Sequence, residues 1–117
     1  MTNELVDEMA ERHDRFMKDP PAIRLGGIAA DLARIASFAS NPANRQAILD
    51  MLEESKWFIE WTAPSEEPSK AARLVEIQVS LALMEYRLHR GDLDFASLSR
   101  LAAEWSDEVL GMSGLLE

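Results

Sequence analysis

The chain has 117 residues, of which 47% are hydrophobic and 28% charged, with no cysteine and a formal net charge of −9. These values are typical of one globular domain over residues 1–117, and a chain without cysteine can form no disulfide, thiolate nucleophile or cysteine-ligated zinc site. The negative charge makes nucleic acid and anionic membranes poor partners, because their phosphate groups repel an acidic surface.

The N-terminal sequence predicts neither a signal peptide nor a membrane anchor. Residues 1–16 contain no basic segment followed by a continuous apolar stretch, which a secretory signal needs. The longest apolar-rich stretch, residues 74–88, is interrupted by charged and polar side chains and is too polar to span a bilayer. We therefore expect a soluble, cytoplasmic protein.

Hydrophobic spacing predicts an all-α fold of five helices joined by short loops. The first helix is expected over residues 4–18, where Thr2 or Asn3 can cap it and Pro20 and Pro21 follow its end. The second is expected over residues 22–40, and Gly26-Gly27 predicts a bend or a late start. Its apolar seam is flanked by small residues that would let another helix approach closely: Gly26, Ala29, Ala33, Ser37 and Ser40.

The third and fourth helices are expected over residues 42–62 and 69–90. Asn41 can cap the third helix, and Pro42 suits its first turn. The fourth helix is apolar on two sides, which predicts a central helix covered on both. One side carries Leu74, Ile77, Leu81, Met84 and Leu88, and the other carries Ala72, Val75, Val79, Ala82, Leu83 and Tyr86.

The fifth helix is expected over residues 94–110, after a stop at Gly91 and a cap from Asp92 or Asp94. Gly111 and Gly114 are expected to break it, and the apolar tail that follows should dock on the bundle or on a partner. Helices two to five then supply a four-helix-bundle-like core, and helix one packs across it.

The sequence contains few residues with catalytic or metal-binding potential. His13 lies on the apolar side of the first helix without an evident catalytic partner, and His89 lies at a helix end, where it complements the dipole. Glu85 and His89 could share a metal, but two ligands are too few. The neighbouring Glu53 and Glu54 are interpreted as solvated surface. The sequence predicts no cofactor, no metal and no catalytic residue.

Two tryptophans are the most unusual feature. Trp57 and Trp61 lie one turn apart, off the apolar stripe of the third helix and among acidic side chains, so their rings can stack. Either another part of the chain covers them, or they mark an interface or a pocket. The acidic surroundings would favour a basic or amphipathic protein partner. The candidate interface or pocket residues are Trp57, Trp61, Tyr86, His13 and Trp105.

Residues 54–64 (ESKWFIEWTAP) and 112–116 (MSGLL), together with Asp19-Pro20-Pro21 and residues 32–35, resemble a group of small uncharacterised all-helical proteins from cyanobacteria. The resemblance covers most of the chain and implies an all-helical fold. It implies no activity and no functional residue.

The functional hypothesis rests on the apolar surface that the predicted bundle would leave uncovered. The two-sided fourth helix, the off-stripe tryptophans and the apolar tail exceed what four packed helices bury, and a twofold dimer is the commonest way to bury the rest. The sequence therefore favours a non-enzymatic interaction or regulatory protein that forms a homodimer. The alternative is a small-molecule-binding protein or an enzyme with a pocket between helices.

Overall fold

The computed structural model describes residues 2–116, with side chains from residue 4 onward. Within this range the chain forms five α-helices and no strand, which confirms the all-α fold. The helices are α1 (Thr2–Met17), α2 (Pro21–Phe38), α3 (Arg45–Thr62), α4 (Pro68–Arg90) and α5 (Phe95–Ser113), with short 3-10 turns at Pro42–Asn44 and Ala63–Ser65. None of these helices is both long and apolar enough to cross a membrane.

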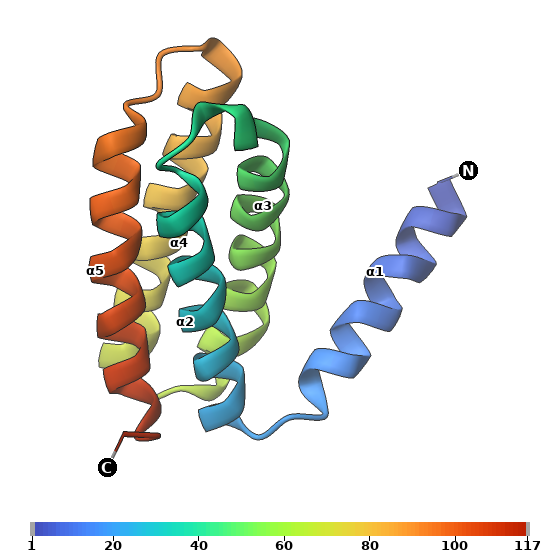
Figure 1. The fold of residues 1–117 in the computed structure, drawn as a ribbon. Helices are drawn as coiled ribbons and strands as arrows, with labels where there is room; N and C mark the ends of the chain where they lie inside the picture. Colours follow the sequence, from blue (N-terminus) through green and yellow to red (C-terminus); the bar gives the residue numbers. More distant parts are fainter. Residues whose placement is uncertain (1, 117) are drawn as a thin grey trace.

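Helices α2 to α5 form an up-and-down four-helix bundle in which each helix runs opposite to the one before it (Figure 1). Helix α2 packs against α3 and most extensively against α5, and α4 packs mainly on α3. Helix α1 does not lie across the bundle as predicted. It contacts α3 near its own C-terminal end and diverges from the other helices toward its N-terminus (Figure 1).

The predicted turn chemistry is largely confirmed. Asn41 accepts a hydrogen bond from the backbone N–H of Ala43, 3.0 Å away, but it caps the 3-10 turn Pro42–Asn44 instead of α3, which begins at Arg45. Asp94 caps α5 by accepting from the backbone N–H groups of Ala96 and Ser97. Gly91 ends α4 in the left-handed conformation with φ of 79°, which a residue without Cβ adopts at low cost. The predicted cap of α1 by Thr2 or Asn3 lies outside the described side chains.

The late start predicted at Gly26-Gly27 and the break predicted at Gly111 are wrong. Gly26 and Gly27 lie inside a continuous α2, and Gly111 lies inside α5, which ends only at Gly114 with φ of 75°. Tertiary packing on either side of these glycines outweighs their low helix propensity of about 1 kcal/mol. Gly26 also makes room for the tail, because a Cβ there would lie 2.8 Å from Cδ1 of Leu115. The apolar tail thus contacts the bundle through Leu115, whereas Leu116 is exposed.

Helices α2 and α5 approach each other through small side chains. The hydroxyls of Ser99 and Ser106 on α5 each donate to a backbone carbonyl of α2, at Ala36 and Ala29 respectively, with oxygen–oxygen distances of 2.7 Å. Ala102 lies between the two serines on the same face of α5 and is fully buried. Of the small residues predicted to support a close approach, Ala29 is buried, whereas Ala33, Ser37 and Ser40 face solvent.

Helix α4 is not the central helix that its sequence predicts. Its inner seam is buried at Leu74, Ile77, Leu81 and Leu88. Its second apolar side remains exposed, because α2 lies diagonally across the bundle and α4 packs mainly on α3. We call this second side the outer face of α4; it consists of Ala72, Val75, Val79, Ala82, Leu83 and Tyr86.

The close packing of α2 against α5 predicts that a larger side chain at Ala102 destabilises the bundle. We expect Ala102→Leu to lower the free energy of unfolding by about 1–3 kcal/mol, because the larger side chain must separate two helices held by short hydrogen bonds. Chemical denaturation measures the change. Ala103→Leu, one residue along and exposed, is the matched control and should leave stability within about 0.5 kcal/mol. Equal effects of the two changes would contradict the close packing.

Candidate functional site

The two tryptophans of α3 stack, as their spacing predicts. The ring centroids of Trp57 and Trp61 lie 5.9 Å apart with an interplanar angle of 29°. Their environments differ, because Trp61 is half-buried whereas Trp57 retains 39% of its accessible surface. Cover within the chain therefore applies to Trp61, whereas a role of Trp57 in an interface or a pocket stays a prediction.

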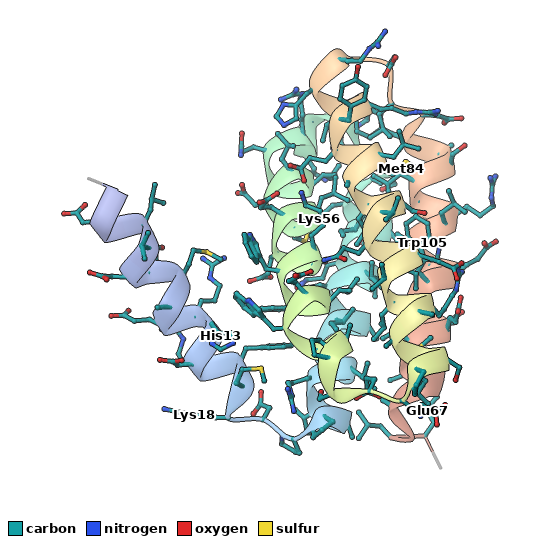
Figure 2. The ribbon with its side chains drawn as sticks, turned by 180° about the vertical axis from the view of Figure 1, so that it is seen from behind. His13, Lys18, Lys56, Glu67, Met84 and Trp105 are labelled. Carbon is teal, nitrogen blue, oxygen red and sulfur yellow. The ribbon has the colours of Figure 1, made fainter. Side chains whose placement is uncertain are left out.

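The C-terminal half of α1 covers Trp61. Phe16 stacks on Phe58 at 4.2 Å between ring centroids and nearly parallel, and the His13 ring meets Trp61 edge-on at 5.0 Å. Figure 2 shows His13 on the side of α1 that faces α3. We call these residues and Trp57 the aromatic cluster. It attaches α1 to the bundle, and His13 serves as a packing residue at its edge.

The N-terminal half of α1 has no such cover. Leu5 and Val6 retain 66% and 65% of their accessible surface, although Leu5 continues the side of the helix that carries Phe16. Leu5 lies eleven residues before Phe16, about 16 Å along the helix axis, where α1 has diverged from α3 (Figure 1). Leu5 is recognisably apolar in the sequence. Its exposure, however, depends on the direction of α1, and that direction is set by the contact of α1 with α3.

An open groove of about 430 Å³ runs between α3 and α4 beside Trp57. Helix α3 contributes Trp57 and the charged side chains, and α4 contributes neutral ones, so the groove joins the exposed tryptophan to the outer face of α4. Its lining consists of Glu53, Lys56, Trp57, Glu60, Gln78, Val79 and Ala82.

An ion-pair network lies beside this groove and includes two of its lining residues, Glu53 and Lys56. The Lys56 Nζ lies 3.0 Å from a carboxylate oxygen of Glu53 and 2.9 Å from one of Glu85 on α4. Although partial burial opposes ionisation of both groups, the paired charges raise the pKa of Lys56 and lower the pKa of Glu53. Figure 2 shows Lys56 on α3 next to α4. The network ties α3 to α4, and with Glu60 also in its lining the groove carries a net negative formal charge.

The remaining candidates, Tyr86 and Trp105, lie apart from the tryptophan pair. Tyr86 is exposed on the outer face of α4, where the Arg90 guanidinium lies 5.6 Å from its ring centroid. Trp105 lies on α5 and is 6% exposed as part of the bundle core. The five candidate residues therefore do not line one pocket, and only Trp57 borders the groove.

A buried carboxyl pair lies between α2 and α3, where the sequence analysis identified no site. Asp31 is almost completely buried, pairs with Arg34, and comes within hydrogen-bonding reach of Glu54. Burial, followed by the hydrogen bond and charge of Glu54, raises the pKa of Asp31 to about 7, against the opposing effect of Arg34. Glu54 is half-buried, so its interpretation as solvated surface is wrong.

The unpaired Oδ2 of Asp31 agrees with a proton shared between the carboxyl groups of Asp31 and Glu54. Its Oδ2 is buried without a hydrogen-bond donor, and a protonated carboxyl could itself donate to Glu54. The sequence does contain a signal, since Asp31 falls three residues after Ile28 and four before Ile35, both on the buried seam of α2. A carboxylate at such a position requires a partner or a proton.

The described residues contain no group of three or more histidine, aspartate or glutamate side chains that could hold a metal ion. His89 is exposed in the last turn of α4, as expected for a residue that complements the helix dipole. Glu85 instead pairs with Lys56.

In comparisons with known proteins, no family model, no curated protein and no solved structure matches this chain. The resemblance to small helical cyanobacterial proteins stays a prediction.

The attachment of α1 makes a prediction about Phe16. We expect Phe16→Ala to weaken the docking of α1 by about 2–3 kcal/mol, because the change removes a buried ring and its stacking contact. Emission from Trp61 should shift to longer wavelength, and amide hydrogen exchange in α1 should rise. Cooperative unfolding of the α2–α5 bundle should change little, since Phe16 lies outside the main core cluster.

Phe38→Ala is the matched control, because Phe38 is an exposed phenylalanine on α2. It should leave tryptophan emission and the exchange of α1 unchanged. If Phe16→Ala also leaves both unchanged, the stacked pair does not hold α1.

The buried carboxyl pair makes a prediction about pH. An acid whose pKa is raised on folding keeps a proton that the unfolded chain releases, so its contribution to stability falls as pH rises between the two pKa values. Here the interval runs from 3.8 to about 7. Relative to Asp31→Asn, the wild-type chain should lose up to about 1.4 kcal/mol of unfolding free energy per pH unit in that interval.

Urea unfolding at a series of pH values between 5 and 8 measures this difference. Asp107→Asn removes one exposed carboxylate from α5 and controls for the loss of charge alone. A difference between wild type and Asp31→Asn that does not vary with pH would show that Asp31 stays ionised in the folded protein.

Proposed function

We propose that this chain is a non-enzymatic protein-interaction domain that acts as a homodimer. One observation carries the proposal: the exposed apolar side chains of α4 are continuous with the groove beside Trp57. The groove beside Trp57 borders Val79 and Ala82, which belong to the outer face of α4. Val79 alone retains 64% of its accessible surface.

Such a surface is unusual on a protein that works alone. Single exposed apolar residues are normal, but contiguous patches mark contact surfaces. Aromatic residues concentrate at the energetic centres of such contacts, and Trp57 and Tyr86 both belong to this surface. A twofold dimer buries the same patch on both copies. Cytoplasmic location and a basic or amphipathic protein partner stay predictions.

The groove supports a second candidate function, the binding of a small molecule. Its volume of about 430 Å³ falls within the range of ligand sites. However, ligand sites usually enclose most of their ligand, whereas Trp57 and Val79 leave this groove open. Protein association therefore fits the geometry better. If the wild-type chain stays monomeric and a small molecule raises its melting temperature in a thermal-shift screen, the second candidate is favoured.

The proposed function predicts the solution mass. Light scattering across a concentration series should give twice the chain mass, with part of the tryptophan emission shifting to shorter wavelength as dimers form. Trp57→Ala should weaken the dimer about 10-fold or more, because it removes a large aromatic contact.

Phe38→Ala serves as the control, because Phe38 has nearly the same exposure as Trp57 but lies on α2. It should leave the dissociation constant unchanged. A wild-type chain that remains monomeric at millimolar concentration would overturn the proposed homodimer. A dimer insensitive to Trp57→Ala would remove the tryptophan from the interface.

A further inference from the structure

We infer that two copies of this chain dock reciprocally, each keeping α1 attached to its own α3 and placing the N-terminal half of α1 on the outer face of α4 of the other copy. This inference rests on the proposed self-association and identifies the surfaces that meet. We call residues 4–11 of α1 the arm.

The arm and the outer face of α4 are both apolar and both uncovered. The arm exposes Leu5 and Val6, and the outer face exposes Val75, Val79 and Leu83. An amphipathic helix laid along such a face buries apolar side chains at helical spacing on both sides. The docking therefore satisfies two unpartnered surfaces of the chain at once.

The arm cannot reach the outer face of α4 in its own chain. Phe16 and His13 attach α1 to α3 through Phe58 and Trp61. From this attachment the arm points away from the bundle (Figure 1). Only a second copy can present its α4 to the arm while the aromatic cluster stays intact.

Charge selects α4 over α3 as the docking helix. Helix α1 carries five carboxylates and two arginines, a formal charge of −3, and all of the charges within the arm are negative. Helix α4 carries four cationic side chains and two glutamates, a formal charge of +2. Helix α3 carries two cationic side chains and four carboxylates, a formal charge of −2, so it repels the arm.

The cations of α4 lie where they can meet the arm. Arg87 and Arg90 are exposed at the C-terminal end of the outer face, and Arg90 stacks on Tyr86 within it. The arm contributes Glu4, Asp7 and Glu8 around its apolar side chains. Acidic and basic groups at the rim of an apolar contact favour its formation and its register.

Twofold symmetry makes the docking occur twice in each dimer. If the arm of one copy docks on α4 of the second, the arm of the second docks on α4 of the first. A single substitution therefore damages both contacts of a homodimer. This doubling allows the two surfaces to be tested by mixing variants.

The test uses the full chain with Leu5→Gln in the arm or Val79→Gln on α4, studied by sedimentation velocity. Both positions are about two-thirds exposed, so neither change should disturb the fold. Each variant alone should dimerise about 100-fold more weakly than wild type, because two copies of an apolar contact are lost. Leu116→Gln, at an exposed leucine of the tail, is the control and should dimerise normally.

Mixing the two variants gives the decisive result. A heterodimer contains one intact contact, formed by the normal arm of the Val79→Gln chain and the normal α4 of the Leu5→Gln chain. The mixture should therefore dimerise at concentrations where each variant alone is monomeric. Raising the salt concentration should weaken the wild-type dimer.

The outcomes separate this inference from the proposed function. A wild-type dimer whose variants keep full affinity, or whose mixture is no stronger than the separate variants, would overturn the arm docking and leave self-association through another surface. A wild-type chain that never dimerises would overturn both.

Discussion

The close contact between α2 and α5 determines how the other helices are placed. Small side chains and two serine hydroxyls allow the backbones to approach, and the serines donate to carbonyls of α2. With α5 on one side and α3 on another, α2 becomes the most enclosed helix of the bundle. Helix α4 is then left diagonally opposite α2, with only its inner seam covered. The exposed outer face of α4 is thus a consequence of where the small residues lie.

The direction of α1 is the second constraint on the surface. Phe16 and Phe58 stack at one end of α1, and the backbone turns at Pro20 just before α2 begins at Pro21. These contacts fix the C-terminal half of α1 on the bundle and leave its N-terminal half outside. One short stacking contact therefore decides both that Trp61 is covered and that Leu5 is exposed.

Sequence reasoning succeeded where structure depends on neighbouring residues. Gly91 and Asp94 act as expected, and Asn41 caps the turn before α3, because capping depends on a side chain and the few peptide groups beside it. The stacking of Trp57 on Trp61 follows from the helical period in the same way. Helix ends shifted by at most three residues, as at the start of α3, where a 3-10 turn precedes the helix, and at the end of α5, where packing carried the helix through Gly111.

The errors concern contacts between residues distant in the sequence. Periodicity showed that α4 is apolar on two sides, but it contains no information about which helix covers each side. The predicted course of helix one failed for the same reason, since Phe16 and Phe58 lie 42 positions apart by their numbers. Asp31 could have been identified from the sequence as a buried carboxyl group, because it interrupts a buried seam. Its partner Glu54 was not, since the pairing depends on the α2–α3 packing.

The α2–α5 contact also has a consequence for how the chain folds. Ser106 and Ala29 are separated by 77 residues, so the most extensive helix contact in the bundle joins its first helix to its last. Ordinary helical bundles fold fast because most of their contacts are local. Here the nascent chain must hold the apolar seam of α2 without its main partner until α5 has left the ribosome. That interval exposes the seam to chaperones and to aggregation, and it makes completion of the bundle a late event in synthesis.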